Sequence, residues 1–251
     1  MKEVHFIAQG KGGVGKSTIA AFLADYLKNK SDMPLHCFDT DPVNPTFSRY
    51  KDFQAEVIKI LTDSNDIDTR FFDGLIEKLV EKDGIGVVDN GAATFIPLMS
   101  YLAENEVASL LAENGVRFVI HVPLQGGQVL KDCMTGLTQI LNSIQAEIVV
   151  WLNEFQGAIE MEGKQFTEFN TYQQNKNRII GIVNVQSRNP DTYGIDIHKM
   201  SNLNLSLTEA ATSNQLGMMP RQRIKTVQKD LYEQLDQVPF LATELHSAEE
   251  A

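Results

Sequence analysis

Residues 10–18 read Gly-Lys-Gly-Gly-Val-Gly-Lys-Ser-Thr, and this stretch decides the fold. The residues before it, Val4-His5-Phe6-Ile7-Ala8, form an apolar run of strand length. Residues 19–27 follow it and have the apolar periodicity of a helix. A strand, a glycine-rich loop and a helix in this order are the context in which a phosphate-binding loop is expected.

The spacing of the loop assigns a task to each of its residues. The glycines allow positive φ, so successive N–H groups turn inward around an anion, and the helix that follows adds its unpaired N–H groups. Lys16 is then expected to reach the β- and γ-phosphates, and the Ser17 hydroxyl to ligate Mg²⁺. A glycine-rich turn without this function would not need lysine and serine at fixed spacing. The loop residues expected to contact the nucleotide are Gly10, Lys11, Gly12, Gly13, Val14, Gly15, Lys16, Ser17 and Thr18.

Apolar runs alternate with helical patterns along most of the 251 residues. This alternation predicts an α/β fold in which helices cover both faces of a mostly parallel sheet, the architecture of P-loop NTPases. We expect one domain over 1–246 and a frayed tail at 247–251. Strands are predicted at 3–8, 35–39, 56–60, 85–89, 117–122, 147–152 and 179–185. Helices are predicted at 16–29, 69–82, 95–112, 127–144, 164–177 and 219–236.

Net charge, cysteine positions and the apolar runs argue against several classes of function. The net charge of −11 argues against broad electrostatic binding to nucleic acid or to an anionic membrane. Cys37 and Cys133 are far apart and suggest no disulfide framework. The amino terminus enters the first strand at once, and no apolar run approaches the length of a membrane span. We therefore expect a cytoplasmic protein that does not bind membranes.

Three acidic residues follow predicted strands. Asp39 and Asp41 come after the second strand, and Asp89 ends the apolar run 85–88. Ligands of parallel sheets bind at the carboxyl ends of strands, so all three are candidates for the nucleotide site. Asp89 is placed where phosphate-loop enzymes hold Mg²⁺ through a Walker-B aspartate. An Asp-Pro turn without function remains the alternative for Asp41.

Lys11 stands at a position that the general loop pattern leaves free. With this lysine the loop resembles that of the deviant Walker A ATPases, the ParA/MinD family, whose loop reads Lys-Gly-Gly-Val-Gly-Lys-Ser/Thr. In that family the lysine contacts the nucleotide of the partner subunit in an ATP-sandwiched dimer. The resemblance implies ATP and Mg²⁺ as cofactors, a homodimer with ATP, and catalytic roles for Lys11, Lys16 and Asp41. It implies that Asp41 positions the attacking water and that Asp39 lies nearer the Mg²⁺ shell.

The base contacts are also implied by the resemblance. The family places an asparagine at the end of a late strand, and here that residue is Asn153. The loop 187–191, which contains Pro190, corresponds to a loop that packs on adenine in the family. The Asn-Lys-x-Asp motif of guanine-specific relatives is missing after the strand 147–152, so ATP is favoured over GTP.

More narrowly, residues 38–47 and 188–194 look like the plasmid transfer and stability ATPases called TraL or StbB. The resemblance implies a Mg²⁺-ATP-dependent dimerising switch in plasmid DNA transfer, partition or positioning. Hydrolysis is expected to be slow and stimulated by a plasmid-encoded DNA-binding or transfer-complex partner. Two alternatives stay open: a synthetase resembling dethiobiotin synthetase, against which Lys11 argues, and a metal-cluster carrier, against which the missing cysteine beside Asp89 argues.

A basic run near the carboxyl end suggests weak, non-specific DNA binding, and a solvated helix face explains it equally well. The apolar stripe interleaved with these residues predicts a helix that packs on the core. The five histidines have no metal-ligand spacing. The basic residues are Arg221, Arg223, Lys225 and Lys229.

Overall fold

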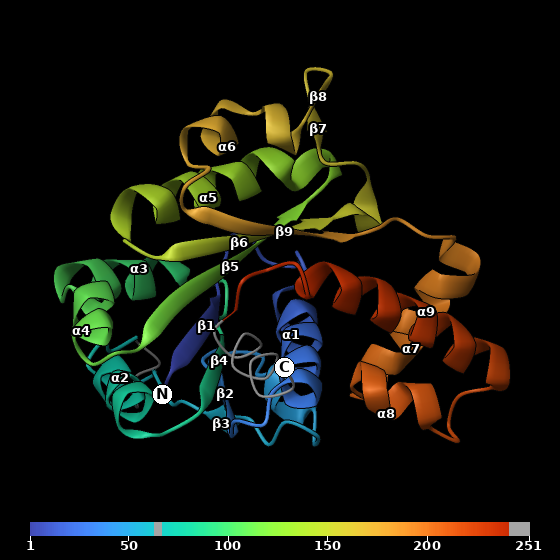
Figure 1. The fold of residues 1–251 in the computed structure, drawn as a ribbon, viewed down its shortest axis with the longest axis horizontal. Coiled ribbons are helices and arrows are strands. Elements are labelled where there is room, and N and C mark those ends of the chain that lie inside the picture. The colour runs from blue at the N-terminus through green and yellow to red at the C-terminus, as the bar shows by residue number, and fades with distance from the viewer. Residues whose placement is uncertain (63–66, 241–251) are drawn as a thin grey trace, which may run out of the picture.

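A computed structural model describes residues 1–62 and 67–240, so the last residues of the predicted domain, 241–246, and the predicted tail 247–251 lie outside the described residues. Its main sheet has seven strands in the order β3-β2-β4-β1-β5-β6-β9, and all of them pair in parallel (Figure 1). This confirms the predicted α/β fold. The strands are β1 (Glu3–Ile7), β2 (Leu35–Asp39), β3 (Glu56–Val57), β4 (Ile85–Asp89), β5 (Arg117–Gln125), β6 (Glu147–Asn153) and β9 (Ile179–Val185).

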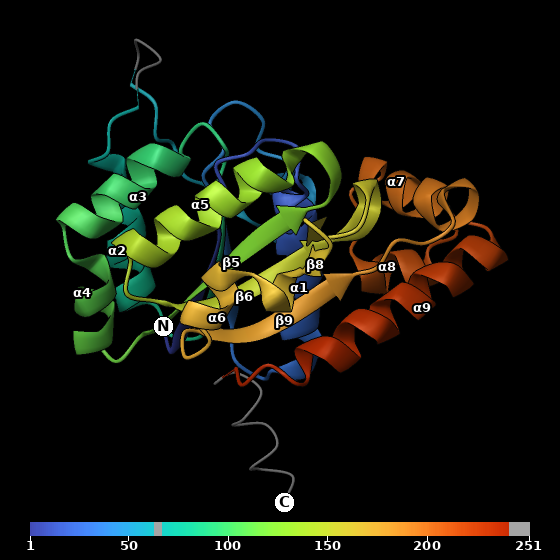
Figure 2. The same cartoon turned by 90° about the horizontal axis from the view of Figure 1, so that it is seen from above.

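Helices cover both faces of the sheet, as the two views show (Figures 1 and 2). On one face lie α1 (Lys16–Lys30), α7 (Ile195–Asn202), α8 (Leu207–Thr212) and α9 (Met218–Leu235). On the other lie α2 (Phe71–Glu81), α3 (Phe95–Glu104), α4 (Val107–Glu113), α5 (Leu130–Ser143) and α6 (Asn170–Gln174). Each face encloses its own apolar core, which explains why the strand interiors are apolar on both sides.

The strand order reverses at β1, which pairs with β4 on one side and with β5 on the other. Open parallel sheets bind ligands at the carboxyl ends of their strands, at such a switch point. The glycine-rich loop 10–15 leaves β1 there and leads directly into α1. The topology therefore brings the predicted phosphate loop next to the ends of β2 and β4, where the acidic residues lie.

The structure corrects several predicted boundaries. The helix predicted at 95–112 is two helices, because Glu106 has φ +49° in the left-handed region and interrupts the turn between α3 and α4. The strand predicted at 56–60 pairs over two residues only. The helix predicted at 127–144 begins with the 3-10 turn η2 (Gly127–Val129), in which Gly127 has φ +76°.

The prediction of one helix at 164–177 was mostly wrong. Glu162 and Gly163 both have positive φ, and they close a small antiparallel hairpin of β7 (Glu160–Met161) and β8 (Lys164–Gln165). The 3-10 turn η4 (Phe166–Glu168) and the short α6 follow. Phe166 and Phe169 are buried three residues apart, and this spacing gave the helical pattern.

The carboxyl-terminal region contains helices that the sequence analysis missed, namely α7, α8 and the π-helical turn η5 (Pro190–Gly194). The last described helix, α9, was predicted at 219–236, and the burial of its apolar stripe confirms that it packs on the core. Within residues 1–62 and 67–240, no helix combines the length and apolar character needed to cross a bilayer. The buried stripe comprises Ile224, Val227, Leu231 and Leu235.

Candidate nucleotide site

The phosphate loop is held open for an anion by its backbone. Gly13 and Gly15 have φ values of +75° and +93°, which side-chain-bearing residues rarely adopt. Gly15 is the N-cap of α1, and no side chain caps this helix. The first N–H groups of α1 therefore have no side-chain acceptor from a cap and face the loop. The first turn of α1 contains no acidic residue. This is the arrangement in which a helix amino terminus binds phosphate.

Lys16 lies inside the loop. Its side chain is folded back so that Nζ donates to the carbonyl oxygen of Lys11 at 3.1 Å, and only 8% of the residue is exposed. Burial lowers the pKa of Lys16, and the nearby carboxylates of Asp89 and Asp41 partly offset this effect. Within the described residues, the Lys16 ammonium makes one hydrogen bond, to a loop carbonyl, and it is well placed to exchange that carbonyl for phosphate oxygens.

Lys11 has the opposite orientation. Its Nζ lies 2.8 Å from Asp132 Oδ2 of α5, on the outer rim of the loop, and 37% of its side chain is exposed. The hydrogen bond to Asp132 raises the pKa of Lys11. One loop thus carries one lysine directed inward and one directed outward.

Ser17 and Asp89 form a pair of oxygen donors beside the loop. The Ser17 side chain lies beside the Asp89 carboxylate and favours its charged form, and Asp89 Oδ1 is buried and has no hydrogen-bond partner among the described residues. Burial raises the pKa of Asp89 to about 7. Asp39 is its neighbour across the β2–β4 pair. A hydroxyl and an orphaned carboxylate oxygen fit a hard cation such as Mg²⁺, which takes few protein ligands and completes its shell with water and phosphate.

Asp39 and Asp41 both organise the loop that follows β2. The Asp39 carboxylate accepts N–H bonds from Asp41 at 3.0 Å and Ser48 at 2.9 Å, while burial raises its pKa. Asp41 Oδ1 accepts from the N–H groups of Val43 and Asn44 at 3.0 and 2.9 Å. Asp41 also lies near Lys16 of the phosphate loop, Asp39 is opposite Asp89, and each supports the backbone of the loop after β2.

The loop after β4 contacts the loop after β2. Any β-carbon at Gly91 would lie 2.9 Å from Asp41 Oδ2, so glycine allows the two segments to approach. Asn90 Oδ1 accepts hydrogen bonds from Thr40 Oγ1 at 3.1 Å and Thr94 Oγ1 at 2.6 Å. These contacts connect the loops after β2 and β4. The sequence analysis did not identify Asn90 or the threonines, since their pairing depends on strand order.

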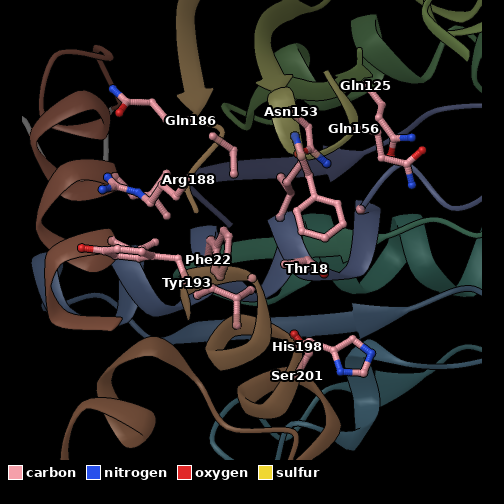
Figure 3. A pocket seen from close by; sticks show the side chains of 18 of the residues that line it. Thr18, Phe22, Gln125, Asn153, Gln156, Gln186, Arg188, Tyr193, His198 and Ser201 are labelled. Carbon is pink, nitrogen blue, oxygen red and sulfur yellow. The ribbon is translucent and has the colours of Figure 1, made fainter. Parts of the chain in front are cut away.

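A cavity of about 340 Å³ opens beside the phosphate loop (Figure 3). It is bounded by the first turns of α1, the ends of β6 and β9, the turn η5, and helices α7 and α9. The predicted residues Gly13, Gly15, Thr18 and Asn153 line it. Sequence analysis missed most of the remaining wall, which includes Phe22, Asn184, Tyr193, Ile197, His198, Ser201, Val227 and Leu231.

Asn153 lies between the loop and the cavity, and both ends of its amide are engaged. Its Nδ2 donates to Val14 O at 3.1 Å, and its Oδ1 accepts from Phe155 N at 3.2 Å. The second bond caps the 3-10 turn η3 (Glu154–Gln156). Asn153 therefore holds the phosphate loop against the end of β6.

Pro190 begins the turn η5 and does not line the cavity, whereas Tyr193 and Gly194 of the same turn do. Arg188, just before the turn, lies over the Tyr193 ring at 5.1 Å and donates to Asp230 Oδ2 of α9 at 2.9 Å. These contacts fix one wall of the cavity (Figure 3). The family resemblance indicated the loop 187–191, but not that Tyr193 and Gly194, which follow it, face the cavity.

Cys37 and Cys133 are both free and buried, on opposite faces of the sheet. The described part of the chain contains no group of three or more histidine, cysteine or acidic residues placed to hold a metal ion. A metal held by Ser17, Asp89 and phosphate oxygens does not require such a group.

Comparison with known proteins places this site in a family. A model of the CobQ/CobB/MinD/ParA nucleotide binding domain matches residues 5–224. The protein TraL of Escherichia coli is 42% identical over 243 residues, covering 96% of this chain and 100% of that protein.

Two solved structures share the fold. The septum site-determining protein MinD of Pyrococcus horikoshii OT3, complexed with Mg-ADP, has a TM-score of 0.53 at 15% identity, covering 94% of this chain and 96% of that one. A ParA family ATPase from Chlorobium tepidum TLS has a TM-score of 0.50 at 14% identity, covering 90% and 99%. The phosphate loop, the acidic strand ends and the matched family model together show that this chain belongs to the CobQ/CobB/MinD/ParA nucleotide-binding family.

Proposed function

We propose that this protein is a Mg²⁺-dependent ATPase that dimerises in its ATP-bound state and acts as a switch in plasmid DNA transfer, partition or positioning. The observation that carries the proposal is the pair of lysines in one loop. Lys16 is buried inside the loop, and the Lys11 ammonium lies on its outer rim. One lysine therefore serves the protomer's own nucleotide, and the other is available to a nucleotide held by a second copy.

The rim position of Lys11 is compatible with reorientation. Its partner Asp132 is itself 59% exposed, and ion pairs between exposed side chains stabilise weakly because water screens them. A triphosphate brought to the rim by a second protomer is a stronger partner than one carboxylate, since it has several charged oxygens. ATP can therefore move Lys11 from Asp132 to the dimer interface.

The residues around Ser17 support hydrolysis of the nucleotide. Ser17 and Asp89 would hold Mg²⁺, which neutralises charge on the β- and γ-phosphates. Lys16 would bind the same phosphates from inside the loop. Asp41 uses Oδ1 to hold the backbone of its loop, while Oδ2 faces Gly91. We assign Oδ2 to orienting the attacking water, a task that requires position and not a change of charge.

The cellular role rests on similarity to TraL and on the resemblance to plasmid transfer and stability ATPases. We propose a single domain over 1–246, cytoplasmic action, slow hydrolysis and a plasmid-encoded DNA-binding or transfer-complex partner that stimulates it. Any direct DNA binding is proposed to be weak and non-specific. Two of the basic residues already have acidic neighbours, because Arg223 bonds Asp196 and Lys229 lies 3.7 Å from Glu233.

Size-exclusion chromatography with light scattering, in ADP and in a non-hydrolysable ATP analogue, tests the switch. The native protein is expected to be monomeric in ADP and dimeric in the analogue. Lys11→Ala is expected to bind ATP and stay monomeric. Lys131→Ala is the matched control, because Lys131 is an exposed lysine of α5 next to Asp132 and is expected to dimerise normally.

The second candidate function is an ATP-dependent synthetase of the same fold, in which Lys11 has no role across an interface. Ordinary analogue-driven dimerisation of Lys11→Ala, or a native protein that stays monomeric in the analogue, would favour that candidate. The two functions differ in their response to a carboxylate substrate, since only the synthetase needs one to release ADP.

A further inference from the structure

Three buried polar side chains form one hydrogen-bonded group between the loops after β2 and β4. Thr40, Asn90 and Thr94 are fully buried, and we call them the inter-loop group. Asn90 Oδ1 accepts from Thr40 Oγ1 at 3.1 Å and from Thr94 Oγ1 at 2.6 Å. Thr40 directly precedes Asp41 in the chain, and Asn90 directly follows Asp89. The group therefore connects the residue assigned to the attacking water with the residue assigned to Mg²⁺.

Thr94 anchors the inter-loop group to a packed helix. It is the N-cap of α3, and its Oγ1 also lies 2.9 Å from Gly91 O. Phe95 and Leu98 in the first turn of α3 are both buried in the core. Because this turn is packed, the bond from Thr94 fixes the Asn90 amide from the α3 side.

Thr40 is attached to the β4 side by its main chain and by its side chain. Its N–H donates to Asp89 O at 2.9 Å, which keeps the chain beside β4 as it leaves β2. Its hydroxyl has two acceptors at 3.1 Å, Asp89 O and Asn90 Oδ1, and one proton to donate. Only the bond to Asn90 gives Thr40 an attachment that its main chain does not already provide.

Asp41 is packed against the residue that follows Asn90. A β-carbon at Gly91 would lie 2.7 Å from Asp41 Cγ and 3.0 Å from Asp41 Cα. The Asp41 carboxylate also accepts two N–H bonds from its own loop, so it moves with that loop. A shift of Thr40 away from Asn90 would therefore move the Asp41 carboxylate relative to Asp89. A displacement of about 1 Å can slow a reaction that depends on position by about 100-fold.

We infer that Asn90 is a positioning residue for hydrolysis, because its Oδ1 connects Thr40 to α3 and so fixes Asp41 relative to the Mg²⁺ site. This inference rests on the proposed function, since it assigns a further residue to the same reaction. The connection uses Asn90 Oδ1, and Asn90 Nδ2 takes no part in it. Asn90 acts through Thr40 and Asp41, so its loss should slow hydrolysis only while Asp41 is present.

Single-turnover hydrolysis at saturating ATP tests the inference, because it measures the rate constant separately from affinity. Thr40→Val removes the hydroxyl at nearly constant shape, and the rate is expected to fall by about tenfold, the effect of one lost hydrogen bond. Thr40→Ser keeps the hydroxyl and is expected to retain the native rate. Thr46→Val is the matched control in the same loop, because the Thr46 hydroxyl donates to Asn44 O within that loop at 3.2 Å. It should hydrolyse ATP at the native rate.

Double variants show whether the effect passes through the inter-loop group. Asn90→Ala is expected to slow hydrolysis by at least about tenfold, and adding Thr40→Val should slow it no further, because both changes break the same connection. In an Asp41→Ala protein, Asn90→Ala should have no further effect on the rate. If Asn90→Ala does not fold, as judged by its melting transition, Thr94→Val takes its place in both pairs. Effects that multiply in either pair, or a native rate in Thr40→Val, would overturn the inference.

Hydrogen exchange in the nucleotide-free protein separates this inference from the proposed function. Exchange of the backbone amides in residues 40–44 is expected to be faster in Thr40→Val and Asn90→Ala than in the native protein and in Thr46→Val. Equal exchange in all four proteins would overturn the inference. A native protein that binds ATP without hydrolysing it would refute the proposed function, and the exchange measurement would then decide the role of Asn90 by itself.

Discussion

Buried polar atoms at the carboxyl ends of the strands differ from those in the middle of the same sheet in whether they have hydrogen-bond partners. Five buried side-chain atoms lack a hydrogen-bond partner in the described chain, and four of them are near the carboxyl ends of β1, β4 and β9. In the middle of the sheet, buried polar side chains bond to one another across strands, and the fifth unpartnered atom, His5 Nε2, lies at the end of that group. The four atoms at the strand ends are Gln9 Oε1, Asp89 Oδ1, Asn90 Nδ2 and Asn184 Oδ1.

The hydrogen bonds that join Trp151, His121 and His5 in the middle of the sheet run in a defined direction, and we call these three residues the mid-sheet chain. Trp151 Nε1 donates to His121 Nδ1 at 2.9 Å, and an indole nitrogen can only donate. His121 must therefore carry its proton on Nε2, which lies 3.0 Å from His5 Nδ1. His5 in turn carries its proton on Nε2, 3.6 Å from Glu3 Oε2. Arg117 Nη1 lies 3.3 Å from the other oxygen of Glu3. Hydrogen bonds thus link Trp151 of β6 through His121 of β5 to His5 of β1, and the Glu3 carboxylate lies near the end of this series without a hydrogen bond to His5.

This difference in hydrogen bonding suggests that the two groups of residues have different roles. Polar groups that are satisfied by other side chains stabilise one packing of the strands, and nothing further is needed to explain them. Polar groups left unsatisfied at the strand ends destabilise the free protein, and a ligand that bonds to them recovers that free energy. Changes at the strand ends should therefore alter nucleotide affinity, and changes in the middle should alter stability.

The largest effect is expected from Lys16→Ala. The ammonium is the buried charge closest to the phosphates, so ATP affinity should fall by at least about 100-fold, the effect of losing a charge-assisted phosphate contact. The free energy of unfolding without nucleotide should not fall, because the buried Lys16 ammonium makes only one hydrogen bond within the described residues. Calorimetry and urea unfolding measure the two quantities. Unchanged ATP affinity in a folded variant would refute the site.

Asp41→Ala is expected to lower the hydrolysis rate by about 100-fold while ATP affinity stays close to native, since orienting water is a task of the transition state. Because Asp41 Oδ1 also holds Val43 and Asn44, Asp41→Asn is the necessary control. The amide keeps one acceptor for the backbone but lacks the carboxylate. Single-turnover hydrolysis in both variants decides. Native rates in Asp41→Ala would assign the water to another residue.

Trp151→Phe tests the prediction that changes in the middle of the sheet alter stability and not nucleotide affinity. The phenyl ring fills much of the same space and removes the donor to His121, leaving a buried imidazole nitrogen unsatisfied. The expected loss is about 2 kcal/mol in the free energy of unfolding. ATP affinity should not change. A variant of native stability with weakened ATP binding would show that the mid-sheet chain belongs to the site.

The same comparison explains what could be predicted from the sequence. Residues 10–18, Asp39, Asp41 and Asp89 were predictable because each follows a recognisable strand, and parallel order brings strand ends together. The hydrogen bonds that Asn184 makes with Gln234 of α9 could not be predicted, because they depend on how α9 packs against the end of β9. The contacts between histidines depend on register, since His121 is opposite Ile7 and reaches His5 diagonally.

The smallest effect concerns the pH dependence of stability. Burial and the neighbouring His5 hold the pKa of His121 well below its ordinary value, so this imidazole stays neutral in the folded chain while it takes up a proton near pH 6.5 when unfolded. The unfolded state then binds more protons, and stability is lost as pH falls. Between pH 7.5 and 5.5 the loss from this one group is about 1.4 kcal/mol.

His121→Asn isolates that contribution. The shorter amide can still accept from Trp151 and does not titrate. The free energy of unfolding of the variant should therefore depend less on pH than that of the native protein. Asp89 acts in the opposite direction. Its pKa is raised in the folded state, so as pH falls the folded protein binds this proton before the unfolded chain does, and the folded state is stabilised. Since both proteins contain Asp89, its effect cancels in their difference. Urea unfolding at pH 7.5 and 5.5 should show that the native protein loses about 1.4 kcal/mol more than the variant. Equal losses would mean that His121 is protonated in the folded chain, and the direction assigned to the Trp151–His121–His5 chain would then be wrong.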